Sequence, residues 1–293
     1  MRRGALAIFL AIGLLQATAS AQDFSKIQIE KVVSGLRFSE GPVWSREGFL
    51  VFADVPTNRL WKLVPGEKAE VFRENAEGAS GDAYDAQGRL YTCESRSRRV
   101  TRTDKKGQIE VIADRWEGKR FNAPNDIVVR HDGNVYFTDP AFGSQADARE
   151  LDFYGVYRIA PKGQLSLVAK ASGRPNGIAL SPNGRTLYVG NSDEHIIRAY
   201  DLDRSGEASN ERVAISDIEG VPGGIRTDEK GNLYVAAKGL AIYTSSGKLL
   251  LNLDLAETPS NCAFGDPDLQ TLYVTAKTSL YRIRLDVKGS VQY

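Results

Sequence analysis

The stretch Asn125-Asp-Ile-Val-Val-Arg-His-Asp-Gly-Asn-Val-Tyr-Phe-Thr138 contains the pattern that decides the fold. Two short apolar runs, Ile127–Val129 and Val135–Phe137, flank a polar turn that contains an Asp-Gly pair. Val, Ile and aromatic residues favour strands, and an Asp-Gly turn between two such runs is typical of a β-hairpin. The stretch is therefore expected to form the first two strands of one antiparallel sheet.

This hairpin pattern recurs six times along the chain. The copies begin at residues 40, 80, 125, 176, 223 and 261, so successive copies are 40, 45, 51, 47 and 38 residues apart. A third β-rich run follows each hairpin, and often a fourth. Four short strands at a period in the forties are typical of a β-propeller blade, and the alternation of apolar residues with period two disfavours helical repeats. We predict an all-β fold, a six-bladed β-propeller with four-stranded antiparallel blades around a central channel.

The N-terminal segment has the features of a secretory signal peptide. Arg2 and Arg3 precede the apolar run Ala5–Leu15, and Ala19-Ser20-Ala21 offers small residues for cleavage. We predict that residues 1–21 are removed and that the mature protein is periplasmic or secreted, with an uncleaved anchor as the alternative. No other segment of the sequence approaches a membrane span.

The remaining residues, 22–293, are predicted to form a single propeller domain. The β-like segment Ile27–Val33 precedes the first blade and is expected to pair with the last blade, closing the ring and hiding two sheet edges. With 38 Lys and Arg against 37 Asp and Glu, the chain has a formal net charge of +1, which does not indicate nucleic-acid binding. We expect a monomer that binds a small molecule.

In a propeller, the first strand of each blade lines the channel, so equivalent positions in these strands form a ring around the axis. One carboxylate and several amide oxygens converging there suit a hard divalent cation, Ca²⁺ first. Zinc is disfavoured because neither His131 nor His195 lies in the ring. The alternative for any single Asn is turn chemistry beside Gly or Pro. The ring consists of Glu40, Ser80, Asn125, Asn176, Gly223 and Asn261.

A second ring lies at the ends of the second strands. It is polar in the first four blades and plain Ala in the last two, which indicates a site on the axis that is biased toward blades one to four. Its members are Asp54, Glu94, Asp139, Asn191, Ala237 and Ala276.

Six stretches of the sequence, in this order and spacing, resemble the SMP-30/gluconolactonase/luciferin-regenerating-enzyme-like family of six-bladed propellers. The resemblance covers residues 30 to 287 and is strongest for the bacterial gluconolactonase-type branch. The stretches are Ser39-Glu-Gly-Pro-Val-Trp44, Gly88–Glu94 with Arg98–Arg102, Arg120-Phe-Asn-Ala-Pro-Asn-Asp126, Tyr136–Pro140, Pro175-Asn-Gly-Ile178 and Asn261–Gly265.

The resemblance implies a metal-dependent hydrolase of small sugar lactones. It places Glu40 and Asn176 on metal-ligand positions and Asn125 on a position that contacts the metal or the substrate. Arg120 and Asn122 fall near substrate-contacting positions. With Asn261 from the ring, the expected ligand set binds Ca²⁺, with Zn²⁺, Mn²⁺ and Mg²⁺ as alternatives.

Two positions depart from the family pattern. The family usually has Pro-Asp-Gly in the fifth blade, where the Asp is a metal ligand and candidate general base, but this chain has Pro222-Gly223-Gly224. Ser95 stands where the branch tends to carry His. The lost carboxylate should weaken Ca²⁺ binding. The alternative function is therefore a non-catalytic propeller that binds a metal or sugar ligand.

In the expected mechanism, the cation polarises the lactone carbonyl and a carboxylate assists the attacking water. Glu40, Asp139 and Glu94 are the candidate bases. Asp139 is preferred, because it ends a strand of the blade that carries Asn125, and Glu94 is also a candidate substrate contact. A turn cap before Pro140 is the alternative role for Asp139.

Overall fold

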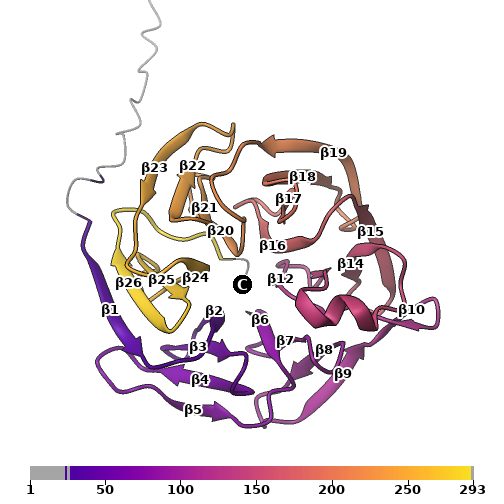
Figure 1. Cartoon of the computed structure of the whole chain (residues 1–293), viewed down its shortest axis with the longest axis horizontal. Helices are drawn as coiled ribbons and strands as arrows, with labels where there is room; N and C mark the ends of the chain where they lie inside the picture. The colour runs from indigo at the N-terminus through magenta and orange to yellow at the C-terminus, as the bar shows by residue number, and fades with distance from the viewer. Residues whose placement is uncertain (1–23, 25–26, 292–293) are drawn as a thin grey trace, which may run out of the picture.

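The structure is a computed structural model, and it describes Phe24 and residues 27–291. Six four-stranded antiparallel sheets surround a central channel, as Figure 1 shows, so the predicted six-bladed propeller is confirmed. The predicted signal peptide at residues 1–21 lies outside the described residues and stays a prediction, which N-terminal sequencing of the protein from its host would check. None of the helices in the described part of the chain has the length and apolar character needed to cross a bilayer.

Each blade begins with a strand beside the axis. The hairpin predicted in the third blade is present, with Ile127 opposite Phe137 and Val129 opposite Val135. The inner strands are β2 (Ser39–Ser45), β6 (Ala79–Tyr84), β12 (Ile127–Val129), β16 (Pro175–Leu180), β20 (Ile225–Thr227) and β24 (Pro259–Gly265).

The other strands of each blade follow outward from the axis in chain order. The second strands are β3 (Phe49–Asp54), β7 (Leu90–Glu94), β13 (Val135–Asp139), β17 (Thr186–Asn191), β21 (Leu233–Ala236) and β25 (Thr271–Ala276). The third strands are β4 (Arg59–Leu63), β8 (Arg99–Thr103), β14 (Tyr154–Ile159), β18 (Ile196–Leu202), β22 (Leu240–Tyr243) and β26 (Ser279–Arg284). The outer strands of blades one to five are β5 (Glu70–Arg73), β9 (Ile109–Ala113), β15 (Leu165–Ala171), β19 (Ala208–Ile215) and β23 (Leu249–Leu253).

The outer strand of the last blade comes from the beginning of the chain. Strand β1 (Ile29–Ser34) pairs antiparallel with β26, and its Val33 lies opposite Leu280. This confirms the predicted closure of the ring. Blades one and six are also joined by side chains, because the Trp44 and Tyr273 rings stack with centroids 6.1 Å apart.

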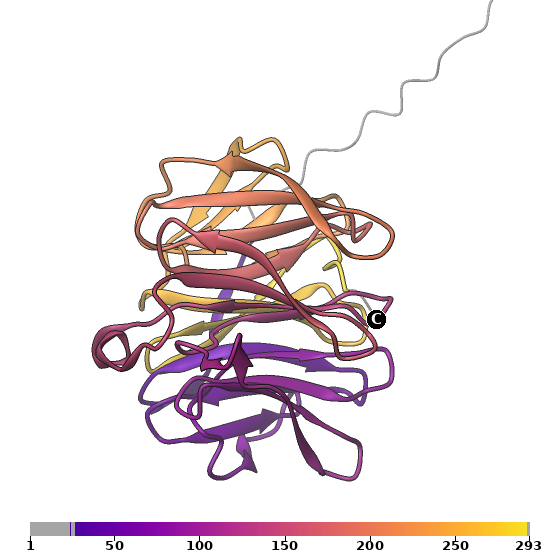
Figure 2. The ribbon, with the colours of Figure 1, turned by 90° about the vertical axis from the view of Figure 1, so that its right-hand side faces the viewer.

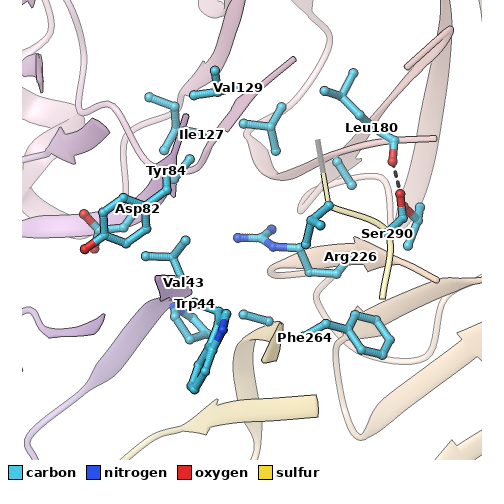
Figure 3. Close-up of a pocket in the computed structure, with 17 residues that line it drawn as sticks. Val43, Trp44, Asp82, Tyr84, Ile127, Val129, Leu180, Arg226, Phe264 and Ser290 are labelled. Atoms are coloured by element: carbon cyan, nitrogen blue, oxygen red, sulfur yellow. Dashed lines mark hydrogen bonds between the residues drawn. The ribbon is translucent and has the colours of Figure 1, made fainter. Parts of the chain in front are cut away.

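The two ends of the channel differ. The C-terminal segment closes one end, where Ser290 donates a backbone hydrogen bond to the Thr227 carbonyl at 2.8 Å. A small cavity of about 90 Å³ remains beside it, with Asp82, Arg226 and Phe264 in its wall (Figure 3). The short 3-10 helix η1 (Gly143–Ala148) lies on the opposite face from the C-terminus (Figure 2). The η1 face is therefore the end of the channel that the C-terminal segment does not cover.

Candidate active site

A cavity of about 560 Å³ lies on the η1 face, where the inner strands begin. We call it the inner cavity. Four of the six positions of the predicted ring line it, namely Glu40, Ser80, Asn125 and Asn176. The rest of its wall comprises Phe38, Val55 and Ser95 together with residues 142–145 at the start of η1.

The hydrogen bonds of these polar side chains leave three oxygens without a donor. Asn125 Nδ2 donates to Ser80 Oγ at 3.4 Å, and Asn176 Nδ2 donates to Ser192 Oγ at 3.1 Å. Glu40 Oε2 accepts a hydrogen bond from the backbone N–H of the next residue, Gly41, at 3.0 Å. No described residue donates a hydrogen bond to Glu40 Oε1 or to Oδ1 of either Asn. Each amide is thus anchored through its nitrogen, and its oxygen remains available in the cavity wall.

This donor set fits a hard divalent cation. Carboxylate and amide oxygens are the ligands that Ca²⁺ prefers in proteins. The described residues contain no cluster of three or more His, Cys, Asp or Glu side chains that could hold a metal ion elsewhere. Burial raises the pKa of Glu40 to about 7, and the nearby Asp126 adds to this effect. A bound cation would favour the ionised form of Glu40.

Asn261, the fourth predicted metal ligand, has a different position. Its Nδ2 donates to Glu40 Oε2 at 3.3 Å, and its Oδ1 accepts from the Cys262 backbone N–H at 2.8 Å. It is 2% exposed and does not line the inner cavity. In this arrangement Asn261 orients Glu40, and its role as a ligand stays a prediction.

The structure leaves no room for a side chain at position 223, where the family usually has an acidic residue in the fifth blade. A Cβ atom on Gly223 would lie 2.3 Å from the Ser260 carbonyl oxygen, and one on Gly224 would lie 1.8 Å from Asn261 Oδ1. The backbone of blade five therefore packs directly against blade six. An acidic residue at 223 would require this backbone to move.

The second ring has a structural role that its sequence pattern did not reveal. Asp54 Oδ1 accepts the backbone N–H groups of Arg37 and Phe38, which precede β2, at 3.1 and 3.0 Å. Asn191 Oδ1 accepts those of Asp193 and Glu194 in the turn that follows β17. These oxygens tie down backbone segments beside the channel mouth.

Asp139 follows the same pattern. It is fully buried, and its two oxygens accept the backbone N–H groups of Asn122 and Ala123, each at 2.8 Å. Burial raises the pKa of Asp139 to about 7 in spite of these hydrogen bonds. Asp139 therefore positions the segment that contains Asn122, and its predicted role as general base remains untested.

Glu94 also has its oxygens occupied. Its carboxylate pairs with Arg73 at 2.7 Å and with Arg99 at 2.6 Å, and it accepts from Thr101 Oγ1 at 3.0 Å. At 1% exposure it does not line the inner cavity. Its role as a substrate contact stays a prediction.

The other two predicted substrate contacts, Asn122 and Arg120, are separated. Asn122 lines a second cavity of about 400 Å³, which we call the outer cavity. Its Nδ2 donates to the carbonyls of Asp139 and Phe153, and its buried Oδ1 has no hydrogen-bond partner among residues 27–291. Arg120 is not in the wall of either cavity, and its guanidinium donates to the Ser97 carbonyl at 2.9 Å.

Sequence reasoning missed the segment that joins the two cavities. Ser144 and Gln145 of η1 line both, as do Val55 and Ser95. Helix η1 has no counterpart in the other blades. The spacing of 51 residues between the third and fourth hairpin patterns, the longest of the five, marks this insertion, because insertions in repeat proteins map to loops on one face.

The chain is similar to proteins that act on lactones. The SMP-30/gluconolactonase/LRE-like region matches residues 38–278. A gluconolactonase from Zymomonas mobilis is 34% identical over 89% of this chain and 82% of its own length. The solved structure of a gluconolactonase from Xanthomonas campestris has a TM-score of 0.83 at 33% identity, covering 89% of this chain and 90% of that one. A pentonolactonase from Haloferax volcanii is 27% identical over 83% of each chain.

Proposed function

The chain belongs to the SMP-30/gluconolactonase/LRE-like family, and on this premise we propose that it is a lactonase that hydrolyses small sugar lactones at the inner cavity with the help of a divalent cation. Relatives that act on gluconolactone and on pentonolactones support the substrate class. The observation that carries the proposal is the set of three oxygens without donors, from Glu40, Asn125 and Asn176, in the wall of one cavity.

These three side chains would hold the cation, Ca²⁺ first. A bound cation of this kind supplies Lewis-acid polarisation of the lactone carbonyl. Ser80 and Ser192 fix the two amides through their nitrogens, so that little rearrangement is needed on binding. Because the set includes only one carboxylate, we expect weaker Ca²⁺ binding than in a site with two.

The other residues of the chain orient the substrate and the water. Phe38, Val55 and Phe142 give the inner cavity apolar walls that reduce the access of bulk water. Asn122, positioned by Asp139, offers its unpartnered Oδ1 to a substrate hydroxyl. Glu40 is the carboxylate that lines the inner cavity, and its Oε1 would be the charged ligand of the cation.

The test is hydrolysis of glucono-1,5-lactone and pentonolactones by the mature protein. We expect activity that requires Ca²⁺, Mn²⁺ or Zn²⁺ and disappears with a chelator. Glu40→Gln should lower kcat/KM by a factor of about 100 or more, because it removes the charged ligand of the cation. Glu110→Gln, a change of the same type on the exposed outer strand β9, should retain full activity.

A ligand-binding protein without hydrolase activity is the second candidate, and Gly223 favours it, because that position lacks the acidic side chain of the family. Calcium binding without hydrolysis of any lactone or ester in a broad panel would establish this second function. Equal activity of Glu40→Gln and the wild type would refute the proposed site.

A further inference from the structure

The outer cavity differs from the inner one in charge. Its wall contains Arg96 and Arg98 and no acidic side chain, whereas Glu40 is the charged residue that lines the inner cavity. The two cavities share four wall residues and therefore adjoin, with hydrogen-bond acceptors in the wall of the inner one and basic side chains in the wall of the outer one.

The backbone that carries Arg96 is held firmly. Its N–H donates to the Glu77 carbonyl at 3.1 Å, and the preceding Ser95 donates to the Gly78 carbonyl through its N–H and, at 2.8 Å, through its Oγ. A Cβ on Gly78 would lie 2.9 Å from the Cβ of Arg96. The close contact between the Gly78 backbone and Arg96 therefore requires glycine at position 78. The base of the Arg96 side chain is therefore fixed in the cavity wall.

The Arg96 guanidinium has no partner among the described residues. Arg98, in contrast, donates to the Phe121 carbonyl at 2.5 Å and pairs with Glu150 at 3.3 Å. The carboxylate of Glu77, whose carbonyl accepts the Arg96 N–H, accepts from Ser97 Oγ at 2.6 Å and forms no ion pair with an arginine in the described part of the chain. Arg96 is thus the cation of this wall that remains free for a ligand.

We propose that the outer cavity binds an anionic group on the substrate, a carboxylate, phosphate or sulfonate at the end of the sugar remote from the ester. Arg96 would pair with the anion, since a guanidinium matches carboxylate and phosphate geometry. Asn122 lies in the wall of the same outer cavity, and its buried Oδ1, which has no hydrogen-bond partner among the described residues, would accept from a hydroxyl of the sugar. This inference rests on the proposed function and specifies its substrate class as anionic aldonolactones.

The experiment measures kcat/KM for neutral glucono-1,5-lactone, 6-phosphoglucono-1,5-lactone and glucaro-1,4-lactone. We expect the wild type to prefer at least one anionic lactone by about tenfold, with a preference that declines as salt increases. Arg96→Gln should lower the ratio of anionic to neutral kcat/KM about tenfold, and Arg96→Lys should restore part of it. Arg212→Gln, on the exposed outer strand β19, should leave the ratio at its wild-type value.

The outcomes separate this inference from the proposed function. Hydrolysis of neutral and anionic lactones with equal kcat/KM, or a ratio unchanged in Arg96→Gln, overturns the anion subsite while the lactonase stands. If no lactone is hydrolysed, the proposed function fails, and calorimetric binding of 6-phosphogluconate decides the subsite. Binding that weakens about tenfold in Arg96→Gln supports it, and absence of binding overturns it.

Discussion

Asn125 and Asn261 are the same residue type at equivalent positions of two blades, yet their side chains have different tasks. The Asn125 amide is fixed by Ser80 and leaves its oxygen in the inner cavity, whereas Asn261 uses its oxygen for a backbone N–H and its nitrogen for Glu40. At the scale of the residue, function depends on which atom is already engaged by a neighbour.

The close packing of Gly223 against Ser260 leads to a prediction about stability. Gly223→Asp should lower the free energy of unfolding by about 1–3 kcal/mol, because its Cβ would overlap the Ser260 carbonyl oxygen and force a backbone shift. Gly190→Ala is the control, since the nearest atom to its Cβ would be 3.5 Å away, and it should change the stability by no more than about 0.5 kcal/mol. Urea unfolding measures both. A fully stable Gly223→Asp that binds Ca²⁺ more tightly would contradict this interpretation.

At the scale of the element, β1 determines whether the ring is closed. It supplies the outer strand of the blade that contains Asn261, and its Val32 and Val33 pack against a buried cluster with Leu36 and Trp44. Without β1, strand β26 would have an unpaired edge and this apolar cluster would be exposed.

Truncation tests this dependence. A chain that begins at Gly35 should melt about 10 °C lower than one that begins at Ile27, because it loses the β1 pairing and the burial of two Val side chains. Circular dichroism on heating measures the difference. Equal melting temperatures would show that the ring is stable without this strand.

At the scale of the whole molecule, acidic groups cluster along the channel. Asp82, Asp126 and Glu40 lie along it, and Arg226 is the basic residue among them, 3.5 Å from Asp126 Oδ2. In Figure 3 the Arg226 side chain extends toward the middle of the cavity on whose rim Asp82 lies. A divalent cation at the inner cavity would offset this excess of negative charge.

Asp82 links the channel to the pH dependence of stability. It is fully buried, its Oδ1 accepts from Thr92 Oγ1 at 2.6 Å, and its Oδ2 has no partner. Burial is the main cause that raises its pKa to about 7, Asp126 and Glu94 raise it further, and Thr92 and Arg73 lower it. Between about pH 4 and pH 7 the folded protein holds a proton at Asp82 that the unfolded chain has lost, so stability falls as the pH rises through this window.

We therefore expect Asp82→Asn to be more stable than the wild type at pH 8, by about 1–3 kcal/mol, and to lose this advantage toward pH 4. Urea unfolding at several pH values, with a chelator present, measures the effect. Asp254→Asn, at an exposed position, should follow the wild-type curve at every pH. Parallel curves for Asp82→Asn and the wild type would rule out proton uptake at Asp82.

The sequence by itself determined the propeller, its six blades, the closure by its first strand and the ring that contains Glu40, Asn125 and Asn176. All of these follow from a local hairpin pattern, repeated with a regular spacing that symmetry converts into positions around an axis. Only the tertiary structure decided that Asp139 and Glu94 are engaged by neighbours, that Gly223 packs against Ser260, and that η1 joins the inner and outer cavities. These features depend on contacts between different blades and on loops outside the repeat, and the hairpin pattern carries no information about either.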